Sequence, residues 1–382
     1  MGLEEIMAVS DGRSAGSAPS PLDEYPIHQT HLSMSRVASS DRNFYDRSYF
    51  NGHDRDGGTF FVTGGGVYPN LGVIDAYACV RRGDIQRTVR FSDALGDRGV
   101  DLRVGGYRIE VQEPLQRIRV ICEHDDLGFD LTWHGSFPTV EEQPHLILNG
   151  NRPIIQATRF AQVGSWEGTL HVDGTDRTVD PAVWMGTRDR SWGIRPVGEP
   201  EPPGRAAAEP SGGFWWMYVP LRFDDFAIVL ILQEEPDGKR TLNDAVRIFP
   251  DGRTEQLGWP RYHIEYRSGT RHPIGARLEM TTPDGKPLEV EVRTVTNVPL
   301  HVGCGYGGDP DWLHGRWMGR DWSSSSSYDL TDPAIAGRIP FGVIDHVAHA
   351  RCGDSEGWGL FEHGSLGRHD PTGFADWGSV AP

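Results

Sequence analysis

Lysine is nearly missing from this chain of 382 residues. Only Lys239 and Lys286 occur, and arginine supplies the rest of the positive charge. Acidic residues outnumber basic ones, which gives a formal net charge of −17. Because phosphate binding needs a basic surface, neither a nucleic acid nor an anionic membrane is expected as a partner.

Long apolar runs are also missing. No stretch approaches the roughly 20 apolar residues that a membrane-spanning helix needs. The segment from Met1 to Ser20 lacks the apolar core of a signal peptide. We therefore expect no membrane insertion and a cytoplasmic protein.

Cysteine is scarce and scattered. The four cysteines lie far apart and form no CxxC pair: Cys79, Cys122, Cys304 and Cys352. This spacing supports neither a disulfide framework nor a cysteine-rich zinc site, and it predicts buried free thiols.

A long helical period is absent as well, whereas glycine and proline are abundant, with 48 and 27 residues. Such a composition is typical of a turn-rich β protein. We predict an all-β fold of two antiparallel barrels packed side by side. The expected organisation is a disordered tail at 1–25, a β domain at 26–198, a linker at 199–213 and a second β domain at 214–382.

Short alternating or apolar runs mark the expected strands. These are Thr59–Thr63, Ile74–Arg81, Arg117–Cys122, Gly128–Trp133, Phe214–Pro220, Phe226–Gln233, Leu288–Arg293, Val343–Ala350 and Trp358–His363. Arg159–Val172 reads as two further strands around a glycine-containing turn, and Phe226–Gln233 as a strand buried on both faces. Asp-Gly pairs at 237–238, 251–252 and 284–285 predict hairpin turns.

The segment Gly186–Arg195 combines one carboxylate, three arginines and an indole between two glycines. It has too many charges for a core strand. Asp189 beside Trp192 could donate a proton or hold a cation, and the arginines of the segment, Arg188, Arg190 and Arg195, could fix that carboxylate or an anionic ligand. The alternative is a structural network of arginines around Asp189, and the residue types leave both interpretations open.

Histidine is frequent after residue 260, which raises the question of a metal site. His346 and His349 are three residues apart, and on a strand this offset points them to opposite faces. No zinc or iron ligand spacing supports a metal. We expect no metal, with His346 and His363 hydrogen-bonded in or near a cavity, where an acid–base role stays open. The glycines at 64–66 lack the strand–loop–helix context of a nucleotide site, so no cofactor is expected either.

Aromatic residues give a stronger signal. In Phe214–Tyr218, Trp216 and Tyr218 share a face and Trp215 takes the other, while Trp317 belongs to a later tryptophan-rich stretch. Such rings can fill a barrel interior, or they can line an apolar pocket with a few polar groups, as small-ligand sites do. A cation formed in such a pocket would be stabilised over the indole faces.

These motifs resemble the hydroxyneurosporene synthase (carotenoid hydratase) superfamily, which also contains tocopherol cyclases and fungal Diels–Alderases. The resemblance rests on Gly-x-x-Asp-x-x-Trp-Gly at 186–193, on the preceding segment 162–168 and on the aromatic strand 214–220. Further motifs at 66–70, 314–317 and 357–364 are most similar to a bacterial branch of that group. The resemblance covers residues 40 to 375 and implies two lipocalin-like β-barrels.

In carotenoid hydratases the element reads Asp-His-x-Trp, and the resemblance implies acid–base chemistry with a later Tyr and Asp. Here Asp189 and Trp192 are kept, but Arg190 stands where the histidine would be. A guanidinium does not shuttle protons at neutral pH. The later pair corresponds to Tyr218 and to Asp224 or Asp225.

We therefore expect an enzyme that binds a hydrophobic small molecule, of terpenoid, steroid-like or polyketide type. Acid-initiated hydration or cyclisation at a double bond is the expected reaction. Asp189 is the candidate acid, Trp192 and Trp216 the candidate cation stabilisers, and Tyr218 an orienting group. Asp225 completes the catalytic set, while Arg188, Arg190, Trp317, His346 and His363 are candidate substrate contacts. The alternative is a non-catalytic carrier, and self-association as a homodimer stays open.

Overall fold

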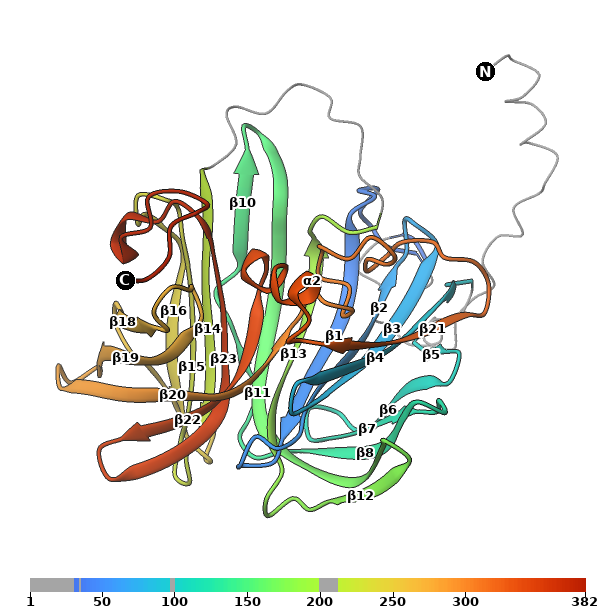
Figure 1. The fold of residues 1–382 in the computed structure, drawn as a ribbon, viewed down its shortest axis with the longest axis horizontal. Coiled ribbons are helices and arrows are strands. Elements are labelled where there is room, and N and C mark those ends of the chain that lie inside the picture. Colours follow the sequence, from blue (N-terminus) through green and yellow to red (C-terminus); the bar gives the residue numbers. More distant parts are fainter. Residues whose placement is uncertain (1–30, 34–35, 97–99, 199–211) are drawn as a thin grey trace.

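Two curled antiparallel sheets, each resembling half of a lipocalin-like barrel, make up the protein (Figure 1). The structure is a computed structural model that describes residues 31–33, 36–96, 100–198 and 212–382. Strands account for 59% of it and helices for 3%, so the all-β prediction is confirmed. The predicted tail at 1–25 and linker residues 199–211 lie outside the described residues.

The first sheet has 14 strands within the described residues. They are β1 (Phe44–His53), β2 (Phe60–Tyr68), β3 (Val73–Arg82), β4 (Ile85–Ala94), β5 (Leu102–Val104), β6 (Tyr107–Glu113), β7 (Arg117–Cys122), β8 (Leu127–Gly135), β9 (Val140–Glu141), β10 (His145–Asn149), β11 (Arg152–Val172), β12 (Thr175–Val179), β13 (Met185–Ile194) and β21 (Trp322–Asp329). Their order is β21-β4-β3-β2-β1-β13-β11-β8-β7-β6-β5, and β9, β10 and β12 pair with β11.

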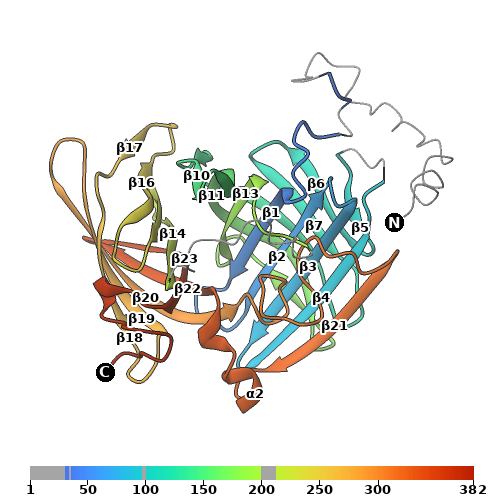
Figure 2. The ribbon, with the colours of Figure 1, turned by 90° about the horizontal axis from the view of Figure 1, so that it is seen from above.

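The second sheet has nine strands, again counted within the described residues, and it lies beside the first (Figure 2). They are β14 (Gly213–Arg222), β15 (Ala227–Glu234), β16 (Arg240–Ile248), β17 (Thr254–Gln256), β18 (Arg261–Tyr266), β19 (Pro273–Thr281), β20 (Pro287–Pro299), β22 (Ile344–Cys352) and β23 (Ser355–Gly367). Their order is β17-β16-β15-β14-β23-β22-β20-β19-β18.

The two halves of the chain are interleaved at one edge. Strand β21 belongs to the C-terminal half of the sequence, yet it pairs along its whole length with β4 of the first sheet. Its serine run, Ser323–Ser327, alternates between exposed and partly buried positions, as expected for a strand at a sheet edge.

Three large apolar clusters explain why the central strands are buried on both faces. One cluster draws its strand residues only from the first sheet, and a second only from the second sheet. The third joins residues of both sheets, including Tyr49, Tyr218 and Leu360. On β14, Trp215 belongs to the second sheet's own cluster, whereas Trp216 belongs to the shared one. Strand β15 is buried at every position, as its sequence predicts.

Two strand predictions are wrong in an instructive way. Arg159–Val172 is part of one strand, β11, rather than two strands around a turn. Gly164 is a packing glycine, because a side chain there would collide with the His134 carbonyl and the Trp133 ring. Gly186–Arg195, which reads as too charged for a core strand, lies largely within β13, between β1 and β11.

Other local predictions are confirmed. The Asp-Gly pairs at 237–238, 251–252 and 284–285 lie between successive paired strands. The four cysteines are free, and three of them are buried. Among the described residues the helices are short: α2 (Pro333–Ala336), η2 (Ile339–Phe341) and η3 (Asp370–Thr372). None of the helices in this part of the chain has the length and apolar character that crossing a membrane requires.

Candidate active site

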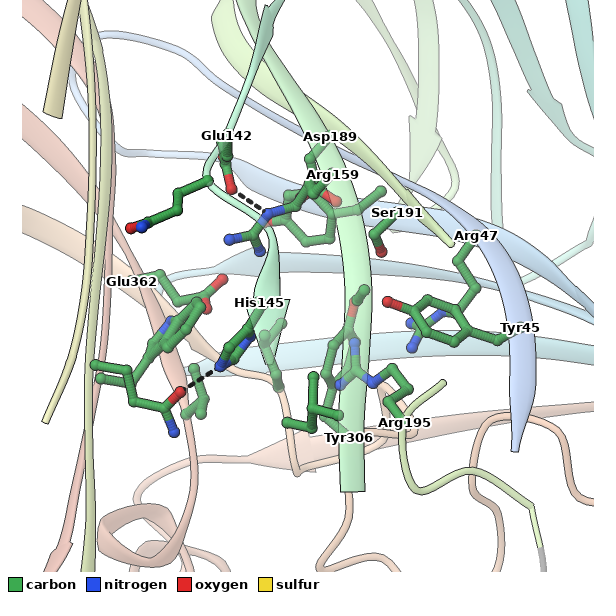
Figure 3. Close-up of a pocket in the computed structure, with 18 of the residues that line it drawn as sticks. Tyr45, Arg47, Glu142, His145, Arg159, Asp189, Ser191, Arg195, Tyr306 and Glu362 are labelled. Carbon is green, nitrogen blue, oxygen red and sulfur yellow. Dashed lines mark hydrogen bonds and ion pairs between the residues drawn. The ribbon is translucent and has the colours of Figure 1, made fainter. Parts of the chain in front are cut away.

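A cavity of about 210 Å³ lies where the two sheets meet (Figure 3). Its apolar wall consists of Ile155, Ala157, Phe214, Trp216, Leu300 and Val343. Its polar lining consists of Tyr45, Arg47, Tyr49, Glu142, Gln143, His145, Arg159, Asp189, Ser191, Arg195, Gln233, Tyr306 and Glu362. The pocket therefore holds three arginines and three carboxyl groups, and it is more polar than the sequence leads one to expect.

Strand alternation selects which side chains reach this pocket. On β13, Asp189 and Ser191 line it, so the intervening Arg190 and the flanking Arg188 and Trp192 take the other face. The neighbouring strand β1 contributes Tyr45, Arg47 and Tyr49 by the same alternation. Each strand thus offers the pocket every second residue.

A pair of carboxyl groups lies at the second sheet's side of the pocket. Glu362 on β23 lines the cavity and pairs directly across the ladder with Asp345 on β22. The Trp216 indole N–H donates to Glu362 Oε1 at 2.5 Å, and the Tyr49 hydroxyl donates to Asp345 Oδ2. The bond from Tyr49 links the two sheets, because Tyr49 belongs to β1.

Burial favours the protonated form of both members of this pair. Asp345 is fully buried, and burial together with the neighbouring Glu362 charge raises its pKa well above the ordinary value. Burial likewise raises the pKa of Glu362, although Arg159 acts in the opposite direction. Among the described residues no N–H or O–H donor reaches Asp345 Oδ1. A proton shared between the two carboxyls would satisfy that oxygen.

A second acidic group lies on the first sheet's side. Arg159 Nε donates to Glu142 Oε2 at 2.5 Å, and the backbone N–H of Glu142 donates to the Arg159 carbonyl at 2.9 Å. Burial raises the pKa of Glu142 to about 7 even though Arg159 opposes the shift. The Arg159 guanidinium also lies over the Tyr218 ring, 4.7 Å from its centre.

Three of the sequence-predicted residues come together here. Asp189 and Trp216 line the pocket. Burial raises the pKa of Asp189, although the arginines at 159, 47, 195 and 188 act against it. Tyr218 is buried just behind the wall, where burial and the charges of Glu142 and Asp189 raise its pKa.

The other residues of the charged segment have structural partners on the opposite face. Arg188 Nε donates to Gln162 Oε1 at 2.7 Å, and Arg190 forms two hydrogen bonds of 3.1 Å to the Asp46 carboxylate. Trp192 is 36% exposed and meets the Phe160 ring edge-on. None of the three lines the pocket.

The remaining predicted residues also lie elsewhere. Asp225 is exposed in the turn between β14 and β15, and Trp317 is 48% exposed in the segment before β21. His363 bonds the Trp216 carbonyl at 2.7 Å and the Tyr266 hydroxyl at 2.9 Å, and His346 bonds the Phe361 carbonyl at 3.0 Å. Burial lowers the pKa of both histidines to about 3, so both are neutral near pH 7.

The paired carboxyls of Asp345 and Glu362, which sequence reasoning missed, are direct neighbours of residues it chose. Asp345 precedes His346, and Glu362 precedes His363 within the glycine-rich motif at 357–364. Period-two alternation was the available signal, but both faces of β22 and β23 carry buried residues, so the sequence does not reveal which face meets the pocket. Glu142 and Arg159 carry no sequence signal of their own.

No cluster of three or more His, Cys, Asp or Glu residues in the described ranges is arranged to hold a metal ion. His346 and His349 do lie on one strand, β22, where their odd spacing separates them. The cysteine thiols add no ligand set, because Cys79, Cys122 and Cys304 are buried and free.

Comparison with known proteins places the fold among solved structures. A family model described as "family of unknown function (DUF8625)" matches residues 20–375. A Nitrosomonas europaea protein provisionally described as AttH superposes with a TM-score of 0.53 at 14% identity, covering 91% of this chain and 98% of that one. Kievitone hydratase from Nectria haematococca gives 0.50 at 15% identity, covering 91% and 96%. Among curated protein sequences no match was found.

Proposed function

The chain belongs to DUF8625, a family of unknown function, and we propose its activity from the pocket between the sheets. The protein is an enzyme that protonates a carbon–carbon double bond of a hydrophobic small molecule and thereby hydrates or cyclises it. Glu362 is the proton donor, and its burial favours the protonated form.

The carboxyl pair is the observation that carries this proposal. A carboxylic acid can protonate an alkene only if it holds its proton at the working pH, and enzymes achieve this by burial and by a nearby like charge. Glu362 has both, because burial raises its pKa and the charge of Asp189, across the same pocket, acts in the same direction. A carrier needs only an apolar shape and has no use for two buried acids side by side.

The chemistry balances with the groups present. Glu362 transfers its proton to one alkene carbon, and the electron pair of the double bond forms the new C–H bond. The positive charge on the other carbon is captured by water or by a nucleophile of the substrate. The proton that the nucleophile then releases restores the carboxylic acid, so no redox partner is required.

The neighbours of the pair hold it in position. The Trp216 indole donates to Glu362 Oε1 and so holds the carboxyl group at the pocket wall. Tyr49 holds Asp345 from the opposite sheet. Phe214 and Trp216 supply aromatic wall beside the site of protonation, where ring faces stabilise a developing cation.

Asp189 is a second candidate for the acid or for the base that accepts the proton. It lines the same pocket, but several arginines favour its ionised form, whereas Glu362 is opposed chiefly by one. We therefore rank Glu362 first. The same fold carries a hydratase in Nectria haematococca, which makes hydration the first reaction to test.

The substrate would be found by comparing lipophilic metabolites in strains with and without the gene. Loss of one product with build-up of its dehydrated or uncyclised precursor supports the enzyme, while unchanged chemistry with a co-purifying ligand supports a carrier. With the precursor in hand, Glu362→Gln should lower turnover at least about 100-fold. Glu356→Gln, an exposed glutamate earlier on the same strand, is the matched control and should retain turnover. Full activity of Glu362→Gln together with an inactive Asp189→Asn would transfer the role to Asp189.

A further inference from the structure

Two arginines form one end of the pocket, on the side away from Glu362 (Figure 3). Arg47 comes from β1, and Arg195 follows the last residue of β13, where its backbone N–H donates to Asn43. The Arg47 guanidinium carbon lies 4.8 Å from the centre of the Tyr306 ring, and that of Arg195 lies 5.5 Å from the centre of Tyr45. Both guanidiniums therefore rest on aromatic faces that also line the cavity.

Neither guanidinium has a hydrogen-bond acceptor among the described residues. Nearby arginines do have acceptors: Arg159 uses Glu142, Arg188 uses Gln162, and Arg190 uses Asp46. Arg47 is only 7% exposed, and a buried cation without an acceptor is costly. A ring face offsets part of that cost, but it does not accept a conventional hydrogen bond from the N–H groups of the guanidinium.

The carboxyl groups of the protein do not neutralise both guanidiniums. Asp75, behind Arg47, already accepts from the Gly315 N–H at 2.7 Å and contacts Tyr68 and His314. Glu142 pairs with Arg159. Glu362 is bonded to Trp216 on the far side of the pocket (Figure 3), which leaves Asp189 as the pocket carboxyl that interacts with both guanidiniums.

His145 does not change this balance. Its ring stacks on Trp216 and bonds Gln233 at the opposite end of the pocket. Burial lowers its pKa to about 4, so it is neutral near pH 7. The arginine end therefore carries two guanidiniums and only one neighbouring carboxyl group, Asp189, among the pocket-lining residues.

We propose that Arg47 and Arg195 bind a carboxylate of the substrate, so that the pocket takes an apolar molecule with a carboxylate at one end. The carboxylate lies between the two guanidiniums, and the apolar body extends along Leu300, Val343 and Phe214 toward Glu362. Paired guanidinium donors match the planar, two-oxygen geometry of a carboxylate. This deepens the proposed function by defining the substrate class, and it rests on that proposal only for the chemical step after binding.

The test uses two probes of nearly equal shape, 2-naphthoate and 2-naphthalenemethanol, with binding measured by calorimetry at pH 7.5 and low salt. The full chain should bind naphthoate about tenfold or more tightly than the alcohol. Arg47→Gln and Arg195→Gln should each weaken naphthoate binding about tenfold and leave alcohol binding within about threefold. Arg190→Gln, which removes a paired arginine on the other face of β13, is the matched control and should leave the naphthoate preference unchanged.

Absence of naphthoate binding, equal affinity for the two probes, or an unchanged preference in both variants would each overturn the inference. Arg195 is only partly buried, so its variant serves if Arg47→Gln does not fold, and alcohol binding reports on the integrity of the pocket. Glu362→Gln should keep the naphthoate preference while losing turnover. A naphthoate preference without catalysis would therefore refute the proposed function alone, and catalysis without the preference would refute this inference alone.

Discussion

Two glutamates of the second sheet, the buried Glu234 and the partly buried Glu362, have opposite electrostatics. Glu234 accepts hydrogen bonds from Arg240 at 3.0 Å, from Tyr262 at 2.7 Å and from His369 at 3.1 Å. Burial alone would raise its pKa, but these donors outweigh burial and hold the pKa below the ordinary value. Glu362 has one donor, Trp216, and a carboxyl neighbour, and its pKa is raised.

The difference teaches that burial does not by itself mark a reactive carboxyl. The set of partners decides whether the ionised or the protonated form is favoured. Glu234 is locked as a structural anion at the end of β15, away from the pocket lining. Glu362 lines the pocket between the sheets, where the proposed reaction has it give up a proton.

The largest expected effect comes from removing the structural anion. Glu234→Gln breaks the buried pair with Arg240, whose side chain is 8% exposed, and it should lower the free energy of unfolding by about 3–5 kcal/mol. Glu362→Gln should change it by about 1 kcal/mol or less, because the new amide can donate to Asp345. Denaturant unfolding of the wild type and both variants at pH 7.5 measures these two losses in the free energy of unfolding. Equal losses would mean that Glu362 is as structural as Glu234.

The next effect concerns pH and Glu142, whose pKa in the folded protein is about 7 against 4.5 as the ordinary value. A raised pKa means that the folded state binds the proton more tightly, so stability from this group is present at low pH and is lost as pH rises from about 4.5 through 7. The loss from this group should reach about 3 kcal/mol. The contribution of Glu234 to stability has the opposite pH dependence. Its pKa is lowered in the folded protein, so its stabilisation is lost as pH falls.

Unfolding free energies of the wild type and Glu142→Gln at pH 5 and pH 8 test this sign. The variant should lose less stability than the wild type over that interval, whatever its absolute stability. Glu141→Gln, an exposed neighbour, is the control and should follow the wild type. A variant whose stability falls as steeply as that of the wild type would contradict the raised pKa.

The smallest effects are expected at two predicted residues that lie outside the pocket. Asp225→Asn, in an exposed turn, should change the free energy of unfolding by less than about 0.5 kcal/mol and leave turnover within about twofold. Trp192→Ala should behave similarly for turnover, because its ring meets Phe160 on the far face of β13. Steady-state kinetics of both variants checks this, and a large loss of turnover in either would return that residue to the catalytic set.

Much of the local structure follows from the sequence. The Asp-Gly turns, the doubly buried β15 and the strand over Arg117–Cys122 follow from turn chemistry and hydrophobic patterning. The long strand β11 could not be recognised, because Gly164 reads as a turn residue. Its actual role, close contact with Trp133, depends on a neighbouring strand.

For the pocket, the sequence by itself identified three of the segments that line it, 186–195, 214–220 and 357–364. It did not identify β1 or the segments that contribute Glu142, Arg159 and Tyr306. Only the tertiary structure decided which face of each strand meets the cavity. On β13 that face bears Asp189 and not Arg188 or Arg190, and on β23 it bears Glu362 and not His363. The physical reason is that these strands carry buried residues on both faces, one toward their own sheet's core and one toward the other sheet. The alternating pattern then shows no polar face that would distinguish the two sides of the strand. A shift of one residue in the strand register would exchange the two sets of side chains.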